Sequence, residues 1–288
     1  MSFMESFRAN AGLYCIAGLF FANIFVWYAV SAESRNGVLT VAFLDVGQGD
    51  AVFIETPSGN QMLIDGGGGR AVLRGLSSFL SFFDRRIDLV LATHPDRDHI
   101  GGLPEVLRRY RVGGLIQNGA SGKSAAYEAL RRYGEEANVA IIAGMRGSRI
   151  ALDKDVFVDI LFPDRDVEGW DTNTASIVAL LTYKNTSFLF TGDAPREVEE
   201  YLVGIDGARL DADVLKLGHH GSKTSSSEKF IDIVSPKYAV VSAGRDNRYG
   251  HPHAEVLDIL EERGVEVYRT MDSGTITFVS DGVSVWRE

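Results

Sequence analysis

LVLATHPDRDHIGG, residues 89–102, is the most informative stretch of this chain. An apolar run, residues 89–92, leads into a loop in which residues 94–99 hold two histidines and two aspartates, and two glycines follow. Imidazole and carboxylate groups are the usual protein ligands of zinc, iron and manganese. A polar loop at the end of a predicted strand adds little to a core, so the stretch predicts a site for two metal ions.

The composition sets limits on the kind of protein. The chain has 288 residues, of which 45% are hydrophobic and 24% charged, as is ordinary for a globular protein. Cys15 is the only cysteine, so an intrachain disulfide and a cysteine metal site are excluded. The formal net charge of −10 argues against indiscriminate binding of nucleic acid by the whole surface. A local basic cluster at residues 108–111 is either a solvated helix face or a group that steers a phosphate.

The N-terminal part has a different character. Residues 11–30, AGLYCIAGLFFANIFVWYAV, carry no charge and are long enough to span a bilayer. Arg8 precedes this run and Glu33 follows it, a weak bias that favours an N-terminus in the cytoplasm. We therefore expect a membrane anchor, with the rest of the chain outside the cytoplasm. A signal peptide cleaved after Ala32, which would give a secreted protein, and a buried soluble helix are the alternatives.

From residue 37 onward, strands come first. Apolar runs at 38–44, 51–56 and 61–65 are separated by turn residues. Helical patterns follow at 70–81, 104–109, 124–136, 196–202, 226–234 and 253–263. This order predicts mixed sheets covered by helices. We expect an anchor or signal segment at 1–36 and one catalytic domain at 37–288.

Three further strand-end loops carry ligand-type residues. An apolar strand ends in Asp193, where a carboxylate could bridge two cations, and another ends in the pair His219-His220. The third loop contains His251 and His253. All six histidines of the chain lie in these loops or at 94–99. This clustering predicts a metal or catalytic site.

Five motifs in this order resemble the metallo-β-lactamase superfamily, and within it the C-terminal hydrolase domain of ComEC competence proteins and free-standing hydrolases of that type. Asp96 replaces the second histidine of the common His-x-His-x-Asp-His motif, as in the ComEC group. ComEC itself has many membrane helices that form a DNA channel, which this chain cannot build. The resemblance covers about residues 38–288 and rests on Asp45-Val46-Gly47-Gln48-Gly49-Asp50, Thr93-His94-x-Asp96-x-Asp98-His99-x-Gly101-Gly102, Thr191-Gly192-Asp193, Leu215-Lys216-x-x-His219-His220-Gly221-Ser222 and Tyr249-Gly250-His251-Pro252.

The resemblance implies an α/β fold, an αββα sandwich, that holds two divalent ions, zinc or manganese. His94 and Asp96 would bind one ion, Asp98 and His99 the other, and Asp193 would bridge them. The other histidines, His219, His220 and His251, together with Asp98, would complete the metal coordination shells or act on the substrate. Asp65 would orient a metal-binding histidine, and the floor of the site would be shaped by Asp45, Gln48 and Asp50. Asn173 would touch metal, water or substrate, or only form a turn, and Ser222 would contact substrate or be structural.

A pair of divalent ions activates water and stabilises charge on a phosphoryl or acyl oxygen. We expect a metal-dependent hydrolase that cleaves phosphodiester bonds, with DNA as the leading substrate. Asp96 makes the metal shell harder, which favours manganese or zinc with a phosphate ester. The alternatives are a phosphocholine esterase or other small-ester hydrolase, and a non-catalytic module that docks to a DNA-uptake or envelope assembly.

Overall fold

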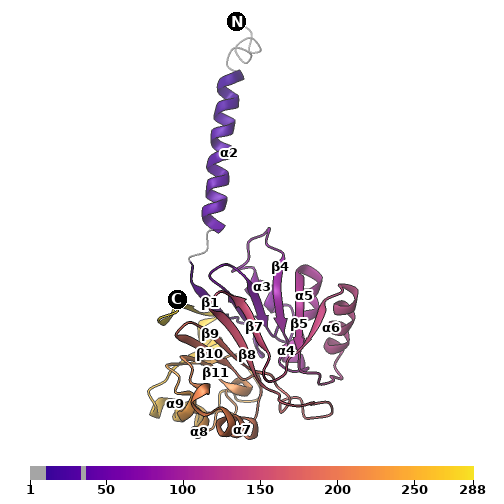
Figure 1. The fold of residues 1–288 in the computed structure, drawn as a ribbon, viewed down its shortest axis with the longest axis vertical. Helices are drawn as coiled ribbons and strands as arrows, with labels where there is room; N and C mark the ends of the chain where they lie inside the picture. Colours follow the sequence, from indigo (N-terminus) through magenta and orange to yellow (C-terminus); the bar gives the residue numbers. More distant parts are fainter. Residues whose placement is uncertain (1–10, 34–36) are drawn as a thin grey trace. The chain divides into compact units, whose positions relative to one another are not determined.

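The computed structural model describes residues 11–33 and 37–288, and the chain divides into two compact units, 1–36 and 37–288 (Figure 1). In the first unit, helix α2 (Ala11–Glu33) covers the uncharged run. Within the described ranges, no helix combines the length and the apolarity needed to cross a membrane, so the predicted membrane anchor is not supported. Arg8, on which the predicted orientation depended, lies outside the described residues.

The second unit is built on two sheets that lie face to face (Figure 1). The first sheet has eight strands, in the order β15 (Val285–Arg287), β14 (Ile276–Ser280), β1 (Leu39–Phe43), β2 (Val52–Glu55), β3 (Gln61–Ile64), β4 (Arg86–Leu91), β5 (Arg111–Gln117) and β6 (Ala140–Ala143). The second has seven, in the order β13 (Glu266–Arg269), β12 (Tyr238–Val241), β11 (Val214–Lys216), β10 (Thr186–Phe190), β9 (Val178–Tyr183), β8 (Val156–Phe162) and β7 (Arg149–Asp153).

Alternate side chains of each strand pack on opposite faces of its sheet, as the pleat requires. In β1, Phe43 faces the other sheet and packs against Phe190 and Phe278, with ring centroids 6.2 and 6.1 Å away. Its neighbour Ala42 belongs instead to the cluster under the helices. The fully buried aromatic side chains between the sheets therefore hold the sandwich together.

Helices cover both outer faces. The first sheet is covered by α3 (Ala71–Leu76), α4 (Arg97–Ile100), α5 (Leu103–Arg109) and α6 (Ala125–Glu136). The second is covered by α7 (Arg196–Asp206), α8 (Glu228–Val234) and α9 (Ala254–Glu262). Short pieces complete the chain: the 3-10 turns η1 (Gly207–Leu210) and η2 (Gly218–Gly221), and α10 (Thr270–Ser273). The layers run helix, sheet, sheet, helix, which confirms the predicted mixed α/β sandwich.

Parallel strands decide where the loops gather. Strands β3, β4 and β5 are parallel in the first sheet, and β10, β11, β12 and β13 are parallel in the second. The carboxyl ends of parallel strands meet at one edge, where α/β proteins commonly bind ligands. The segments that follow β3, β4, β10, β11 and β12 contain most of the predicted site.

One predicted helix is shorter than expected. The pattern at 70–81 predicted a helix throughout, but α3 ends at Leu76. The hydroxyl of Ser77 donates to the carbonyl of Arg74 at 2.7 Å, and such side-chain bonds to the backbone compete with helix continuation.

Candidate metal centre

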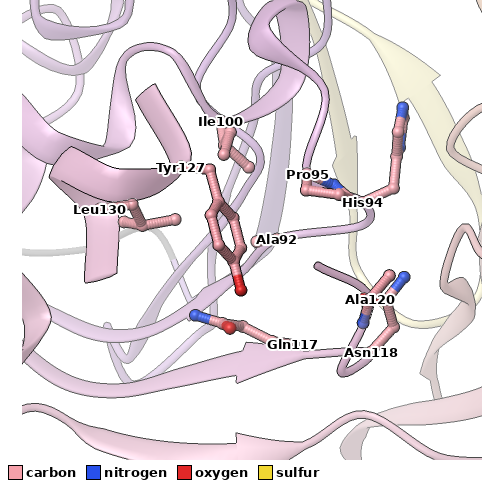
Figure 2. Close-up of a pocket in the computed structure, with 9 residues that line it drawn as sticks. All are labelled: Ala92, His94, Pro95, Ile100, Gln117, Asn118, Ala120, Tyr127 and Leu130. Atoms are coloured by element: carbon pink, nitrogen blue, oxygen red, sulfur yellow. The ribbon is translucent and has the colours of Figure 1, made fainter. Parts of the chain in front are cut away.

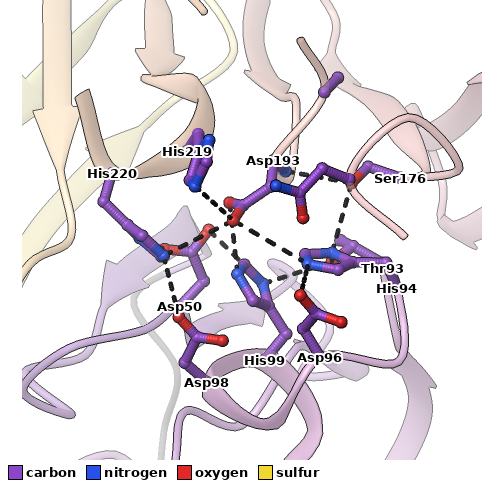
Figure 3. Close-up of polar contacts among 12 residues, drawn as sticks. Asp50, Thr93, His94, Asp96, Asp98, His99, Ser176, Asp193, His219 and His220 are labelled. Carbon is purple, nitrogen blue, oxygen red and sulfur yellow. Dashed lines mark hydrogen bonds and ion pairs between the residues drawn. The ribbon is translucent and has the colours of Figure 1, made fainter. Parts of the chain in front are cut away.

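The predicted ligands converge where the strand-end loops of both sheets meet (Figure 3). The first sheet supplies Asp50, from the loop after β1, and residues 94–99, which follow β4. The second sheet supplies Asp193, after β10, and residues 219–220, after β11. The cluster therefore exists only when the two sheets are packed together.

His99 is fully buried and is held by Asp65. Its Nδ1 atom lies 2.8 Å from Oδ2 of Asp65, whose carboxylate also accepts hydrogen bonds from the Thr93 N–H at 2.8 Å and hydroxyl at 2.6 Å. With Nδ1 engaged, Nε2 faces Oδ1 of Asp193 at 3.3 Å. This is the geometry expected of a carboxylate that orients a metal-binding histidine.

His94 is oriented in the same way by two hydroxyl groups. Its Nδ1 atom lies 3.1 Å from Oγ1 of Thr93 and 3.3 Å from Oγ of Ser176. Its Nε2 atom then lies 3.9 Å from Oδ2 of Asp96 and 3.9 Å from Oδ2 of Asp193. Thr93 and Ser176 were not predicted as site residues, although Thr93 lies in the stretch 89–102 that the sequence marked.

The paired histidines depend on an unusual backbone. His219 and His220 both have positive φ, 48° and 57°, with Gly218 before them and Gly221 after. A non-glycine residue in this region costs about 1–2 kcal/mol, and such strain concentrates at functional sites. The result is that His220 places Nδ1 3.2 Å from Oδ1 of Asp50, while its Nε2 faces the centre.

Lys216 is a member of the site that the sequence did not predict. It is 2% exposed, and its Nζ lies 2.7 Å from Oδ2 of Asp50 and donates to the carbonyl of Leu217 at 2.8 Å. A buried ammonium is costly unless it is paired. Burial alone would raise the pKa of Asp50, but the charges of Lys216 and His220 hold it below its usual value.

The donor set fits a divalent metal. The Nε2 atoms of His94, His99 and His220 and Oδ1 of Asp193 are buried, and none makes a hydrogen bond within the described part of the chain. A buried polar atom without a partner costs about 1–3 kcal/mol. Three buried imidazole nitrogens and a carboxylate converge here without hydrogen-bond partners, and this donor set matches the ligands of zinc and similar ions.

Around Asp193 the side chains form a first group. The ligand atoms of Asp50, His99, Asp193 and His220 all lie within 4.8 Å of one another. Asp50 already contacts an ammonium and an imidazole on the protein side. Asp98 has its Oδ2 3.3 Å from Nε2 of His220 and is more exposed, so it is better placed than Asp50 to complete a metal shell.

A second group approaches the other oxygen of the same carboxylate. Oδ2 of Asp193 lies 3.9 Å from Nε2 of His94 and 3.8 Å from Nε2 of His219. Asp96, with 42% of its side chain exposed, lies at the open side of this group. Thr224 holds His219, with Oγ1 3.0 Å from Nδ1. Nε2 of His220 also lies 3.7 Å from Oδ2 of Asp193, so the two sets of potential ligands share Asp193, and His220 borders both.

The charges within the cluster are strongly coupled. Burial, followed by the nearby charge of His99, lowers the pKa of His94 to about 3. Burial would also lower the pKa of His99, but Asp193 and Asp65 together raise it well above its usual value. Asp193 remains ionised because His99 and His220 outweigh its burial and lower its pKa.

Of two other predicted residues, His251 packs against the cluster, and Asn173 accepts a backbone hydrogen bond from Ser176 at 3.0 Å. His251 is 8% exposed, and its ring centroid lies 5.5 Å from that of His219. Burial, then the charges of His220 and His219, lower the pKa of His251 to about 4. Asn173 has a buried Oδ1 that makes no hydrogen bond among the described residues, so it could still accept one from a ligand.

Three predicted residues shape loops instead. Asp45 is exposed, and its Oδ1 accepts from the N–H of Gly47 at 3.1 Å. Gln48 accepts from the N–H of Gly244 at 3.2 Å, and Ser222 accepts from the hydroxyl of Thr224 at 3.0 Å. In these contacts their side chains stabilise turns around the centre.

Glu199 supports the loop that follows the paired histidines. This α7 residue is 1% exposed and accepts hydrogen bonds from the N–H groups of Ser226 and Ser227, the latter at 2.9 Å. Burial outweighs these bonds and raises the pKa of Glu199 from 4.5 to about 7. The folded protein therefore favours the neutral carboxyl.

Replacing Glu199 with glutamine is expected to change how stability depends on pH. With Glu199, the free energy of unfolding falls as the pH rises from the unfolded pKa near 4.5 to the folded pKa of about 7, by on the order of 3 kcal/mol. Glu199→Gln should flatten this fall. Denaturant titrations of metal-free protein at pH 5 and pH 7 measure it, with the exposed neighbour Glu200→Gln as control. If the free energy of unfolding changed equally with pH in both variants, the raised pKa of Glu199 would be contradicted.

A small cavity lies behind the metal loop (Figure 2). Its volume of about 10 Å³ is room for one water at most. Figure 2 shows the Tyr127 hydroxyl directed toward Gln117, while the imidazole of His94 points away from the cavity. The space is too small for a substrate, so it belongs to the packing around the loop.

This arrangement of strand-end ligands on an αββα sandwich is that of a known class. Residues 44–245 match the family model of the metallo-beta-lactamase superfamily, and the chain belongs to that family. ComE operon protein 3 of Bacillus subtilis (strain 168) is 31% identical over 88% of this chain. Competence protein ComA of Neisseria gonorrhoeae is 35% identical over 88%. The chain spans 34% of the length of each relative. The resemblance predicted from the motifs is confirmed.

Solved structures share the fold at lower identity. A metallo hydrolase from Ignicoccus hospitalis, Igni18, has a TM-score of 0.52 at 19% identity, with 83% of this chain and 98% of that chain covered. The diiron β-hydroxylase CmlA from Streptomyces venezuelae has a TM-score of 0.54 at 16% identity, with 87% and 54% covered. Because the two catalyse different reactions, the fold alone does not decide the chemistry.

Proposed function

We propose that residues 37–288 form a metal-dependent phosphodiesterase whose leading substrate is DNA. The observation that carries the proposal is the convergence of buried imidazole Nε2 atoms on Asp193, each ring oriented through Nδ1 by a protein group. One relative is named a competence protein, and this name supports nucleic acid as the substrate. The position of this unit relative to a membrane, and any partner in DNA uptake, remain predictions from the sequence.

In this proposal the two groups around Asp193 hold two divalent ions, zinc or manganese. One ion would be held by Asp98, His99 and His220 and the other by His94, Asp96 and His219, and Asp193 would contribute to both shells. Bound there, the ions would supply activation of water and neutralisation of charge on the phosphoryl group. Carboxylates at positions 96 and 98 make the shells harder than an all-histidine set and favour manganese.

The chain's own residues have distinct tasks. Asp65, Thr93 and Asp50 fix the imidazole rings before substrate arrives, so no reorganisation is needed during the reaction. His251, with a pKa of about 4, is neutral at pH 7 and could accept a proton or a hydrogen bond from substrate. Asn173 offers a buried side-chain carbonyl oxygen that has no partner among the described residues. Both groups would orient substrate or water by accepting hydrogen bonds, and only His251 could take up a proton.

The test is metal content and hydrolysis by the purified full-length chain. After loading with manganese or zinc, we expect about two ions per chain by elemental analysis, and cleavage of single-stranded DNA in preference to a phosphocholine ester or a β-lactam. Asp98→Asn, prepared in parallel, should lose the activity and so exclude a contaminating nuclease. A phosphocholine ester as the best substrate would favour the esterase alternative. Full metal loading without hydrolysis of any substrate would favour the docking module.

A further inference from the structure

A second cavity, of about 250 Å³, lies between the segment that follows β8 and helix α7. Three aromatic side chains line it: Phe162, Trp170 and Tyr201. Phe162 is 4% exposed and forms the base, with ring centroids 6.5 Å from Trp170 and 6.3 Å from Tyr201. Trp170 and Tyr201 are 38% and 36% exposed, so their rings are accessible from solvent. The cavity offers apolar ring faces to a flat ligand.

The mouth of the cavity carries fixed polar groups. The hydroxyl of Tyr201 donates to Asp164, and the guanidinium of Arg165 bonds both oxygens of the same carboxylate, at 2.9 and 3.1 Å. Asp164 is thereby neutralised, while Arg165 remains exposed with donors to spare. Thr174 also lines the cavity, and its hydroxyl donates to Asp171 at 3.3 Å. Together with Glu197 on α7, the lining carries two carboxylates and one guanidinium around the aromatic rings.

Two residues that line this cavity lie close in sequence to residues of the metal centre. Thr174 lies two residues before Ser176, whose hydroxyl contacts Nδ1 of His94 and accepts from the N–H of Asp193 at 3.2 Å. Glu197, on the α7 wall, lies four residues after Asp193, and four residues span at most about 14 Å. The cavity is therefore within reach of groups that flank a phosphate at the centre.

We propose that this cavity binds one nucleobase of a nucleic-acid strand whose phosphodiester lies at the metal centre. The inference rests on the proposed phosphodiesterase function. Stacking on aromatic rings is the general way in which proteins hold unpaired bases, and it works for any base. A quaternary ammonium also binds aromatic rings. The charges at the cavity do not decide between the two, because Arg165 is paired with Asp164 and Glu197 adds a carboxylate. The preference for a base rests on the flat ring faces and is tested against phosphocholine.

The first measurement does not depend on activity. Calorimetric titration of the metal-free full chain should show that thymidine 5′-monophosphate binds and that deoxyribose 5-phosphate does not. Trp170→Ala should weaken thymidine monophosphate binding about tenfold or more, and Trp170→Phe should restore most of it. Trp286→Ala is the matched control, since Trp286 is 39% exposed on β15, an edge strand of the first sheet.

The second measurement uses hydrolysis. For an oligothymidylate, Trp170→Ala should raise KM about tenfold with kcat within twofold, and an oligonucleotide of abasic sites should show no change. Thymidine monophosphate binding that is insensitive to Trp170→Ala, or phosphocholine binding more tightly than the nucleotide, would overturn the inference even if DNA is cleaved. Trp170-dependent nucleotide binding without any DNA cleavage would uphold the base site and refute the phosphodiesterase.

Discussion

Asp193→Asn is expected to remove at least one metal ion per chain and to lower the rate of hydrolysis about a thousandfold, or about 4 kcal/mol of barrier. The large effect follows from the central position of Asp193, whose carboxylate lies within 3.9 Å of four imidazole Nε2 atoms. No other described carboxylate does so. Asparagine keeps the shape but not the charge. Both sets of potential ligands lose the anion that they share.

Elemental analysis and initial rates on single-stranded DNA measure these effects. Asp258→Asn, an exposed change on α9, is the control and should behave as wild type. The metal-free Asp193→Asn protein should keep its fold, as judged by circular dichroism. Full metal content together with near-normal turnover in this variant would refute the assignment of Asp193 as the shared ligand.

The second large effect is expected from Gly49→Ala. Gly49 has φ +124°, and a Cβ built there would lie 2.1 Å from the carbonyl oxygen of Asp98 and 3.2 Å from its Cβ. The backbone that carries Asp98 and His99 must therefore shift. We expect a loss of about 3 kcal/mol of unfolding free energy together with a loss of metal binding.

Gly47→Ala separates the effect of backbone strain from the effect of the steric contact with Asp98. Gly47 also has positive φ, +77°, but an added Cβ would meet nothing within 4 Å. This variant should cost only about 1–2 kcal/mol, the penalty of the left-handed backbone, and should bind metal normally. Denaturant titration and metal analysis of the two variants compare them directly. Equal metal loading in both would show that the approach of Gly49 to Asp98 does not position the ligands.

Sequence patterns were enough for the layers and for most of the cluster. Apolar runs in the sequence predict the strands, and the parallel strands bring His94, His99, Asp193 and His220 to one edge of the sheets. Each loop with ligand-type residues could be predicted from its own segment of sequence. The pairing of β1 with β14 could not be predicted, because the paired residues lie over 230 positions apart in the sequence and no local pattern indicates which strands pair. The proposed membrane anchor, taken from composition alone, found no support in the structure.

The supporting residues were harder to predict than the ligands. Lys216 stands in an apolar strand, where an isolated charge signals a buried partner, but the partner Asp50 lies in a distant loop. Ser176 acts through its contacts with His94 and Asp193, and a serine in a polar stretch has no sequence signal of that kind. Contacts between loops, rather than residue type, give these side chains their roles.

The origin of the ligands in two different sheets has a thermodynamic consequence. His94 and His99 belong to one half of the sandwich, and Asp193 and His220 to the other. An ion whose ligands come from both halves would act as a crosslink between them, and any opening of the sheet interface would first have to break it. Metal at a hundred times its dissociation constant would add about 2.7 kcal/mol to the free energy of that opening. Metal supply would therefore govern the lifetime of the folded protein as well as its activity.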